Sequence, residues 1–380
     1  MPLPGTTIST QTSSITFYGN AEYTRAQSEF LNSDRLLGGT FYEPPKERYT
    51  GITDRFSFGV LNREKNKYTD FAQSHSNLKQ SFNEDTSVHF KSYTRQTDRG
   101  VEAFVPTGNL GKEEHGGFDP LQVIQNAFNN SQGIETQTNT AVKFTGNAAQ
   151  AILGLQRSLT AGKLINQVNL GDGYSLTVGS ETTKVVNDAI AKASAGAKIT
   201  FSSPFISNQQ TIAALIKARK RGADVTLIAS PSDPLDTSVR QADRQKLANA
   251  GIKIVASHSR LVHQKNITVR GRDVNFVATG SDNSTQSSAD DRTLDYMLMH
   301  RGAGALLNAV EADNLKLAKE LPAVVGASSS SYSSGEFAFL HQTDYGTVES
   351  RNYGTIQGGG GQTGYIKSTK LNEDFFDRHI

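Results

Sequence analysis

The sequence predicts an α/β protein built from two similar halves. Strands alternate with amphipathic helices between Ser180 and His300, which indicates βαβ units and mixed, mostly parallel sheets. A His-x-Lys motif followed by an Asn occurs twice, and the second copy lies 174 positions after the first. The chain has 380 residues, enough for two such halves with a sizeable core.

The second half has the clearest elements. Apolar residues recur at helical spacing in three segments, which predicts helices at 181–196, 208–223 and 238–251. Short apolar runs between them predict strands at 199–205, 224–230 and 252–257. A polar hairpin, "LVHQKNITVRGRDVNFVATGSDN", follows at 261–283. Ligands of such sheets gather beyond the carboxyl ends of the strands, so we expect the site there.

The rest of the chain is less regular. "YTRAQSEFL" predicts a helix and "RFSFGVLN" a strand, but the thin core before residue 88 leaves open whether the first strand and helix of this half are missing or remodelled. The segment 140–164 reads as a strand and a long linking helix. We therefore predict a first half, a linking strand and helix, a second half and a flexible Ser- and Gly-rich tail, at 1–139, 140–170, 171–322 and 323–380.

Composition limits the function classes. The formal net charge is +2, from 39 basic and 37 acidic residues, which argues neither for nor against a nucleic-acid partner. The chain has no Cys, which excludes disulfides, thiol catalysis and cysteine metal sites. No secretory signal and no membrane span of about 18–20 apolar residues is evident. We expect a soluble protein, cytoplasmic or peripheral to a membrane.

The two motifs have the same internal spacing. His89, Lys91 and Asn109 repeat at His263, Lys265 and Asn283, with 2 residues from His to Lys and 20 from His to Asn. Asp98 and Asp273 follow their histidines by 9 and 10 residues. We interpret this as an internal duplication, so that both halves of a site lie in one chain and a monomer carries the whole site.

These residue types suit phosphoryl transfer. Imidazoles act as nucleophile and general acid near neutral pH, while Lys and Asn donate hydrogen bonds to non-bridging phosphate oxygens. This scheme needs no cofactor or metal, and the sequence has no compact cluster of ligands for one.

The motifs resemble those of the phospholipase D superfamily, whose signature is His-x-Lys, a following Asp, and Gly-Ser-x-Asn. The second copy matches it with His263, Lys265, Asp273, Gly280, Ser281 and Asn283, although seven residues rather than four separate its Lys and Asp. In the first copy Pro106-Thr107 replaces Gly-Ser. The segment 138–159, "TNTAVKFTGNAAQAILGLQRSL", is similar to cardiolipin-synthase-like members, and the resemblance spans roughly residues 60–320.

The resemblance implies two pseudo-symmetric βαβαβ halves with the site at their junction. It implies a phosphohistidine formed on one His while the other protonates the leaving oxygen; we expect His89 as nucleophile and His263 as acid, with the reverse as the alternative. Ser281 would donate to a phosphate oxygen, and Asp98 and Asp273 would be structural. Asp295, or else Asp291, would orient a His, as would Glu113 or Glu114 in the first half.

Three functions fit the resemblance. The leading one is a phosphodiesterase or phosphatidyltransferase acting on phospholipid, because the linking segment is cardiolipin-synthase-like. A nuclease on DNA or RNA is the second. The third is a catalytically inactive binding or structural module, which the irregular first half suggests.

Overall fold

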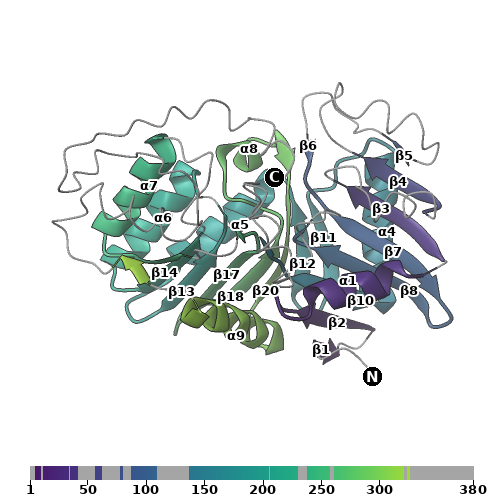
Figure 1. Cartoon of the computed structure of the whole chain (residues 1–380), viewed down its shortest axis with the longest axis horizontal. Coiled ribbons are helices and arrows are strands. Elements are labelled where there is room, and N and C mark those ends of the chain that lie inside the picture. The colour runs from purple at the N-terminus through teal and green to yellow at the C-terminus, as the bar shows by residue number, and fades with distance from the viewer. Residues whose placement is uncertain are drawn as a thin grey trace, which may run out of the picture.

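The computed structural model describes residues 5–9, 12–33, 35–41, 56–61, 78–79, 87–108, 137–204, 206–229, 238–256, 261–320 and 323–325. They form two large mixed sheets that lie side by side, the first in purple and blue and the second in teal and green (Figure 1). The predicted tail beyond residue 325 lies outside the described residues. In the described part of the chain, no helix has the length and apolar character needed to cross a membrane.

The first sheet has the strand order β1-β2-β10-β8-β7-β3-β4-β5. Its strands are β1 (Thr6–Ser9), β2 (Ser13–Tyr18), β3 (Leu36–Phe41), β4 (Phe58–Leu61), β5 (Leu78–Lys79), β7 (Ser92–Thr97), β8 (Gly100–Pro106) and β10 (Ala141–Thr145).

The second sheet has the order β11-β12-β20-β18-β17-β13-β14-β15-β21. Its strands are β11 (Gln167–Gly171), β12 (Tyr174–Val178), β13 (Lys198–Ser202), β14 (Asp224–Ala229), β15 (Lys253–Ala256), β17 (Lys265–Arg270), β18 (Asn275–Gly280), β20 (Tyr296–Arg301) and β21 (Ala323–Val325).

The helices follow the same repeat. The described helices are α1 (Tyr23–Leu31), α4 (Gly146–Thr160), α5 (Ser180–Ala191), α6 (Gln209–Lys220), α7 (Ser238–Asn249), α8 (Gln286–Ala289) and α9 (Ala305–Glu320). Helix α1 follows β2 as α5 follows β12, and α4 follows β10 as α9 follows β20. The first half therefore contains a first strand and helix, and their loss does not explain its weak sequence pattern.

The α/β class with mixed sheets is confirmed, but the expectation of mostly parallel strands is wrong. In the two large sheets only the β3-β4-β5 and β13-β14-β15 pairings are parallel. The hairpins β7-β8 and β17-β18, and the strands β10 and β20 that return beside them, pair antiparallel. Alternation of helices and strands reveals crossovers, whereas it does not reveal which strands return directly.

The halves share one core. Helix α4 packs on β8 of the first sheet and β11 of the second, and α9 packs on β18 and β1. The same cluster contains Phe144 and Ile152 from the first half and Leu176 and Leu298 from the second, all within 1% exposure. A second core, between α5, α6 and the outer face of the second sheet, belongs to the second half alone.

Two short parallel pairings cross between the halves. Strand β6 (Ser87–Val88) pairs with β19 (Thr293–Leu294), and β9 (Gln137–Thr138) pairs with β16 (Leu261–Val262). Because His89 directly follows β6 and His263 directly follows β16, each histidine enters the junction beside a strand of the other half.

Candidate active site

His89 lies in a buried link between β6 and β7. Its backbone N–H donates to the carbonyl of Leu294 over 3.1 Å, and its Nδ1 donates to Asp295 Oδ1 over 2.6 Å. The Ser281 hydroxyl donates to the same carboxylate oxygen over 2.8 Å, and Ser288 donates to Oδ2 over 2.5 Å. Donation from Nδ1 selects the tautomer whose Nε2 has the lone pair, so Nε2 is the reactive nitrogen.

His263 has the corresponding place in the other half. Its backbone N–H donates to the carbonyl of Thr138 over 3.2 Å, and its Nδ1 donates to Asn139 Oδ1 over 2.8 Å. The Thr107 hydroxyl donates to the same amide oxygen over 3.0 Å. Each histidine is thus oriented by an acceptor from the opposite half.

The backbone repeats this arrangement in detail. Thr107 N–H donates to the Thr140 carbonyl and Thr140 N–H donates to the Thr107 hydroxyl, both over 2.9 Å. Ser281 and Tyr296 make the same reciprocal pair over 2.9 and 3.1 Å. Thr107, which replaces the Ser of the first motif, therefore performs the hydroxyl role of Ser281.

The two halves differ in the residue that orients the histidine. Asp295 orients His89, whereas the corresponding Asn139 orients His263, so one histidine contacts a carboxylate and the other a neutral amide. All four side chains are within 1% exposure. In such a dry setting a charged acceptor stabilises an imidazolium much more than an amide does.

The two lysines meet at this junction. Lys91 and Lys265 are 0% and 1% exposed, and the charges of both lower the pKa of Asp295. Burial acts more strongly in the other direction and raises the pKa of Asp295 to about 6, against the hydrogen bonds from Ser288 and Ser281. At neutral pH Asp295 is therefore mainly ionised.

Asn283 lies beyond the end of β18, at the end where Gly280 pairs with Lys265. Its side chain is 6% exposed, and its Oδ1 has no hydrogen-bond partner among the described residues. The buried Tyr296 joins the two halves by donating its hydroxyl to the Pro106 carbonyl over 2.5 Å.

Several predicted site residues lie elsewhere. Asp98 and Asp273 sit in the turns of their hairpins, paired with Arg35 and Arg272 at the surface, which fits a structural role. Asp291, the alternative to Asp295, instead accepts from the backbone N–H and hydroxyl of Ser180 at the start of α5. Asn109, Glu113 and Glu114 lie outside the described residues.

The sequence interpretation missed Asn139, Thr107, Asp282 and Ser288. Thr107 and Asn139 are 32 residues apart, whereas Ser281 and Asp295 are 14 apart. This unequal spacing hides the equivalence of Asn139 and Asp295 in the sequence, although the constant offset of 174 does relate Thr107 to Ser281.

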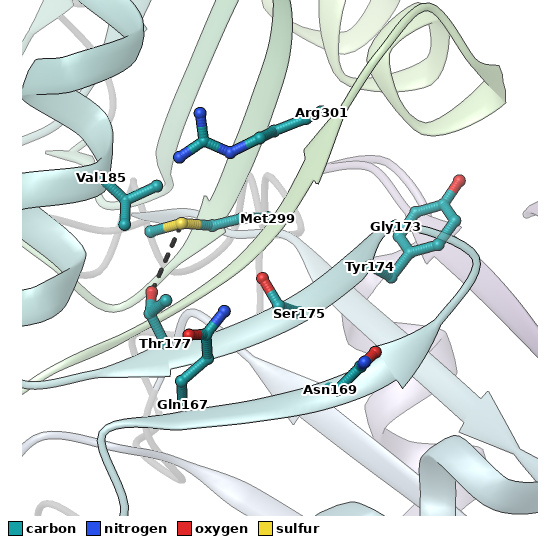
Figure 2. A pocket seen from close by; sticks show the side chains of 9 residues that line it. All are labelled: Gln167, Asn169, Gly173, Tyr174, Ser175, Thr177, Val185, Met299 and Arg301. Atoms are coloured by element: carbon teal, nitrogen blue, oxygen red, sulfur yellow. Dashed lines mark hydrogen bonds between the residues drawn. The ribbon is translucent and has the colours of Figure 1, made fainter.

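A separate hollow of about 470 Å³ lies against β11, β12 and β20 (Figure 2). Arg301 extends over it, with Met299, Thr177 and Ser175 beneath. Its lining has no His, Lys or carboxylate, and it reaches toward the end of β20 that is remote from Asp295. It therefore lacks the paired titratable groups of the junction. Elsewhere too, the described residues include no group of three or more His, Asp or Glu placed to hold a metal ion.

Comparison with known families gives one match, to the phospholipase D-like domain of cardiolipin synthase, over residues 186–313. Comparison with curated proteins gives none. The matched part of the chain contains the second motif and all of β20, and it ends within α9.

Among solved structures, phosphatidylserine synthase from Haemophilus influenzae Rd KW20 matches with a TM-score of 0.57 and 11% identity, covering 84% of this chain and 89% of that one. Nuc, a phospholipase D family member from Salmonella typhimurium, matches with a TM-score of 0.34 and 22% identity over 40% of this chain and 97% of its own. The first likeness shows the fold over both halves. Residues 186–313 thus match the phospholipase D-like domain family, and the two halves together have the fold of a phosphatidylserine synthase.

Proposed function

We propose that the protein is a phosphodiesterase or phosphatidyltransferase that acts through a phosphohistidine on His89. The observation that carries the proposal is the pair of crossed contacts, His89 to Asp295 and His263 to Asn139, which orient two buried imidazoles in one junction. Two lysines near Asp295 supply positive charge for a phosphodiester anion.

The reaction has two steps. In the first, Nε2 of His89 attacks phosphorus, the bond to the leaving oxygen breaks, and His263 gives its proton to that oxygen. In the second, water or an alcohol attacks the phosphohistidine while His263 takes its proton, and the phosphorus–nitrogen bond breaks. Lys91, Lys265 and Asn283 stabilise the non-bridging oxygens in both transition states.

The asymmetry supports the assignment of roles. Asp295 stabilises the positive charge that develops on His89 when its Nε2 bonds to phosphorus. His263 must release its proton to the leaving oxygen, and the neutral Asn139 holds that proton less strongly than a carboxylate would.

The preferred substrate is a phospholipid. Support comes from the family match to a cardiolipin synthase domain and from the shared fold with a phosphatidylserine synthase. The irregular first half had suggested an inactive module, but that half contains the equivalent strands and helix and the Thr107–Asn139 pair.

The test compares wild type, His89→Asn and His263→Asn on bis-p-nitrophenyl phosphate, phosphatidylcholine, phosphatidylglycerol and single-stranded DNA, with and without EDTA. Each substitution is expected to lower turnover of the lipids by about 10³-fold or more, and EDTA is expected to have no effect. His300→Asn is the control, because His300 stacks on Tyr174 near the other end of β20.

The p-nitrophenyl ester separates the two roles. Its leaving group needs no proton, so His263→Asn should still release a first equivalent of p-nitrophenolate and accumulate an acid-labile phosphoenzyme, whereas His89→Asn should release none. The reverse pattern would assign the nucleophile to His263. Turnover untouched by both substitutions would overturn the site, cleavage of DNA alone would favour a nuclease, and no activity on any diester would favour a binding module.

A further inference from the structure

We propose that Asp282, the residue between Ser281 and Asn283, is a positioning residue that acts on His89 through Asp295. This inference rests on the proposed function and deepens it, because it gives the site a second buried carboxylate. Both carboxylates then support the same histidine.

Asp282 is held by its own hydrogen bonds. Its side chain is 6% exposed, and its Oδ1 accepts from the backbone N–H of Ser284 over 2.7 Å. Its Oδ2 accepts from Thr182, in the first turn of α5, over 2.8 Å and from Thr183 over 3.4 Å. Ser284 has a positive φ of 54°, a conformation that non-glycine residues rarely adopt. Its hydrogen bond to Asp282 holds the turn that contains Asn283 in this conformation.

Asp282 and Asp295 are electrostatic neighbours. Burial raises the pKa of Asp282 to about 6, and the charge of Asp295 is the second cause. Ser281, the residue before Asp282, donates its hydroxyl to Asp295 Oδ1 over 2.8 Å, and Ser288 donates to Asp295 Oδ2 over 2.5 Å. A hydrogen bond with Ser288 also lowers the pKa of Asp282. Asp282 is thus a neighbour of the residues that hold Asp295, and Asp295 continues the chain to His89.

The other half has no counterpart to this chain. Gly108 follows Thr107 as Asp282 follows Ser281, and Asn139 stands where Asp295 does. The two buried carboxylates thus lie on the His89 side. This one-sided charge favours a cation on His89 and leaves His263 the readier proton donor.

Other charges around Asp282 are accounted for. Lys91 and Lys265 act on Asp295 from the two hairpins. On α5, Glu181 pairs with Lys184 over 3.5 Å at the surface. Asp291, between α8 and β19, is engaged by Ser180, and Asp290 pairs with Arg292 over 3.4 Å. Asp291 therefore provides a matched control, because both oxygens of its carboxylate accept from Ser180 at the start of α5.

The experiment measures the titration of His89 by NMR of ¹³C-labelled imidazoles, assigned with His89→Asn, in wild type, Asp282→Asn, Asp282→Ser and Asp291→Asn. At the pH where an imidazole titrates both carboxylates are mainly ionised, so removing one negative charge destabilises the imidazolium. Both neutral substitutions at 282 are expected to move the midpoint of His89 to lower pH by about 0.5–1 unit. Asp291→Asn is expected to leave it within about 0.2 unit.

The acidic limb of kcat/KM on the p-nitrophenyl diester should move by the same amount and in the same direction. An unchanged His89 midpoint in folded Asp282→Asn and Asp282→Ser protein would overturn the proposal and leave Asp282 a structural residue. An equal shift in Asp291→Asn would overturn it as well. The NMR titration needs no turnover, so it reads the coupling even where the proposed activity is absent.

Discussion

At the scale of single residues, the buried carboxylates oppose folding at neutral pH. Asp282 and Asp295 have pKa values raised to about 6, mainly by burial, whereas an unfolded Asp titrates near 3.9. The folded state therefore binds more protons between about pH 4 and pH 6. The contribution of these groups to the free energy of unfolding falls as pH rises through that window and is constant above it.

The first prediction is that Asp282→Asn weakens the fall of the unfolding free energy between about pH 4 and pH 6. In the folded wild type this carboxyl is charged only above about pH 6, and the substitution removes that charge. The unfolding free energy of wild type should therefore fall by about 2 kcal/mol more between pH 4.5 and pH 7.5 than that of the variant. Urea denaturation at the two pH values measures the difference. Parallel curves for the two proteins would contradict the prediction.

The second prediction concerns Asn139. Asn139→Asp places a carboxylate beside His263, where Thr107 still donates to it, so the imidazolium becomes more stable. The basic limb of kcat/KM should move to higher pH by about 1 unit, while the acidic limb stays in place. Asn169→Asp, at an exposed position on β11, should move neither limb.

The residues found from sequence are those in the cleaner motif. Asp295 contacts His89, as the resemblance led us to expect of a residue that orients a histidine. The Ser281 hydroxyl, which we expected to donate to a phosphate oxygen, donates to Asp295. Asn139 is separated from Thr107 by 32 residues, so no local pattern relates it to a histidine 124 positions away. Contacts of that kind depend on the pairing of short strands from opposite halves, and a pattern of apolar residues does not reveal that pairing.

At the scale of elements, the junction depends on close strand contact at Gly280. A Cβ there would meet the carbonyl of Tyr296 and lie 2.8 Å from Met297 Cα, both in the backbone of β20, which cannot move aside like a side chain. Gly280 also pairs with Lys265 across β17. The Gly of the second motif is thus required by packing.

The third prediction compares two glycines. Gly280→Ala should lower the unfolding free energy by about 2–4 kcal/mol because it separates β18 from β20. Gly154→Ala, on the exposed face of α4 with open space around it, should raise it by about 0.5–1 kcal/mol. Denaturant unfolding of both variants checks this, and equal effects would contradict it.

Elements with strong periodicity were predicted best. The helix expected from "YTRAQSEFL" is α1 (Tyr23–Leu31), and the three helices of the second half are α5, α6 and α7. The pairing of the strands was predicted less well, because side-chain periodicity records which face is buried and not the direction of the neighbouring strand.

At the scale of the whole molecule, we expect the halves to unfold as one cooperative unit. The largest core is built from both halves, and β6 and β9 pair with strands of the second half. Unfolding of either half would expose that core and separate both histidines from their acceptors.

The fourth prediction follows from this shared core. Calorimetry should show one transition for both sheets, and Phe144→Ala, in the fully buried part of the core, should lower its midpoint without splitting it, at a loss of about 3–5 kcal/mol. Leu315→Ala is the control, because Leu315 is 57% exposed on α9 and should change stability by under about 0.5 kcal/mol. Two resolved transitions would show that the halves unfold separately.

The crossed contacts also bear on what a duplicated chain can do. In a symmetric pair of identical subunits, one codon would specify both acceptors, and a carboxylate beside one histidine would mean a carboxylate beside the other. Two copies in one chain have separate codons, so position 295 holds Asp while position 139 holds Asn. A single duplicated chain can thus give each imidazole its own proton affinity, as the proposed roles of nucleophile and acid require.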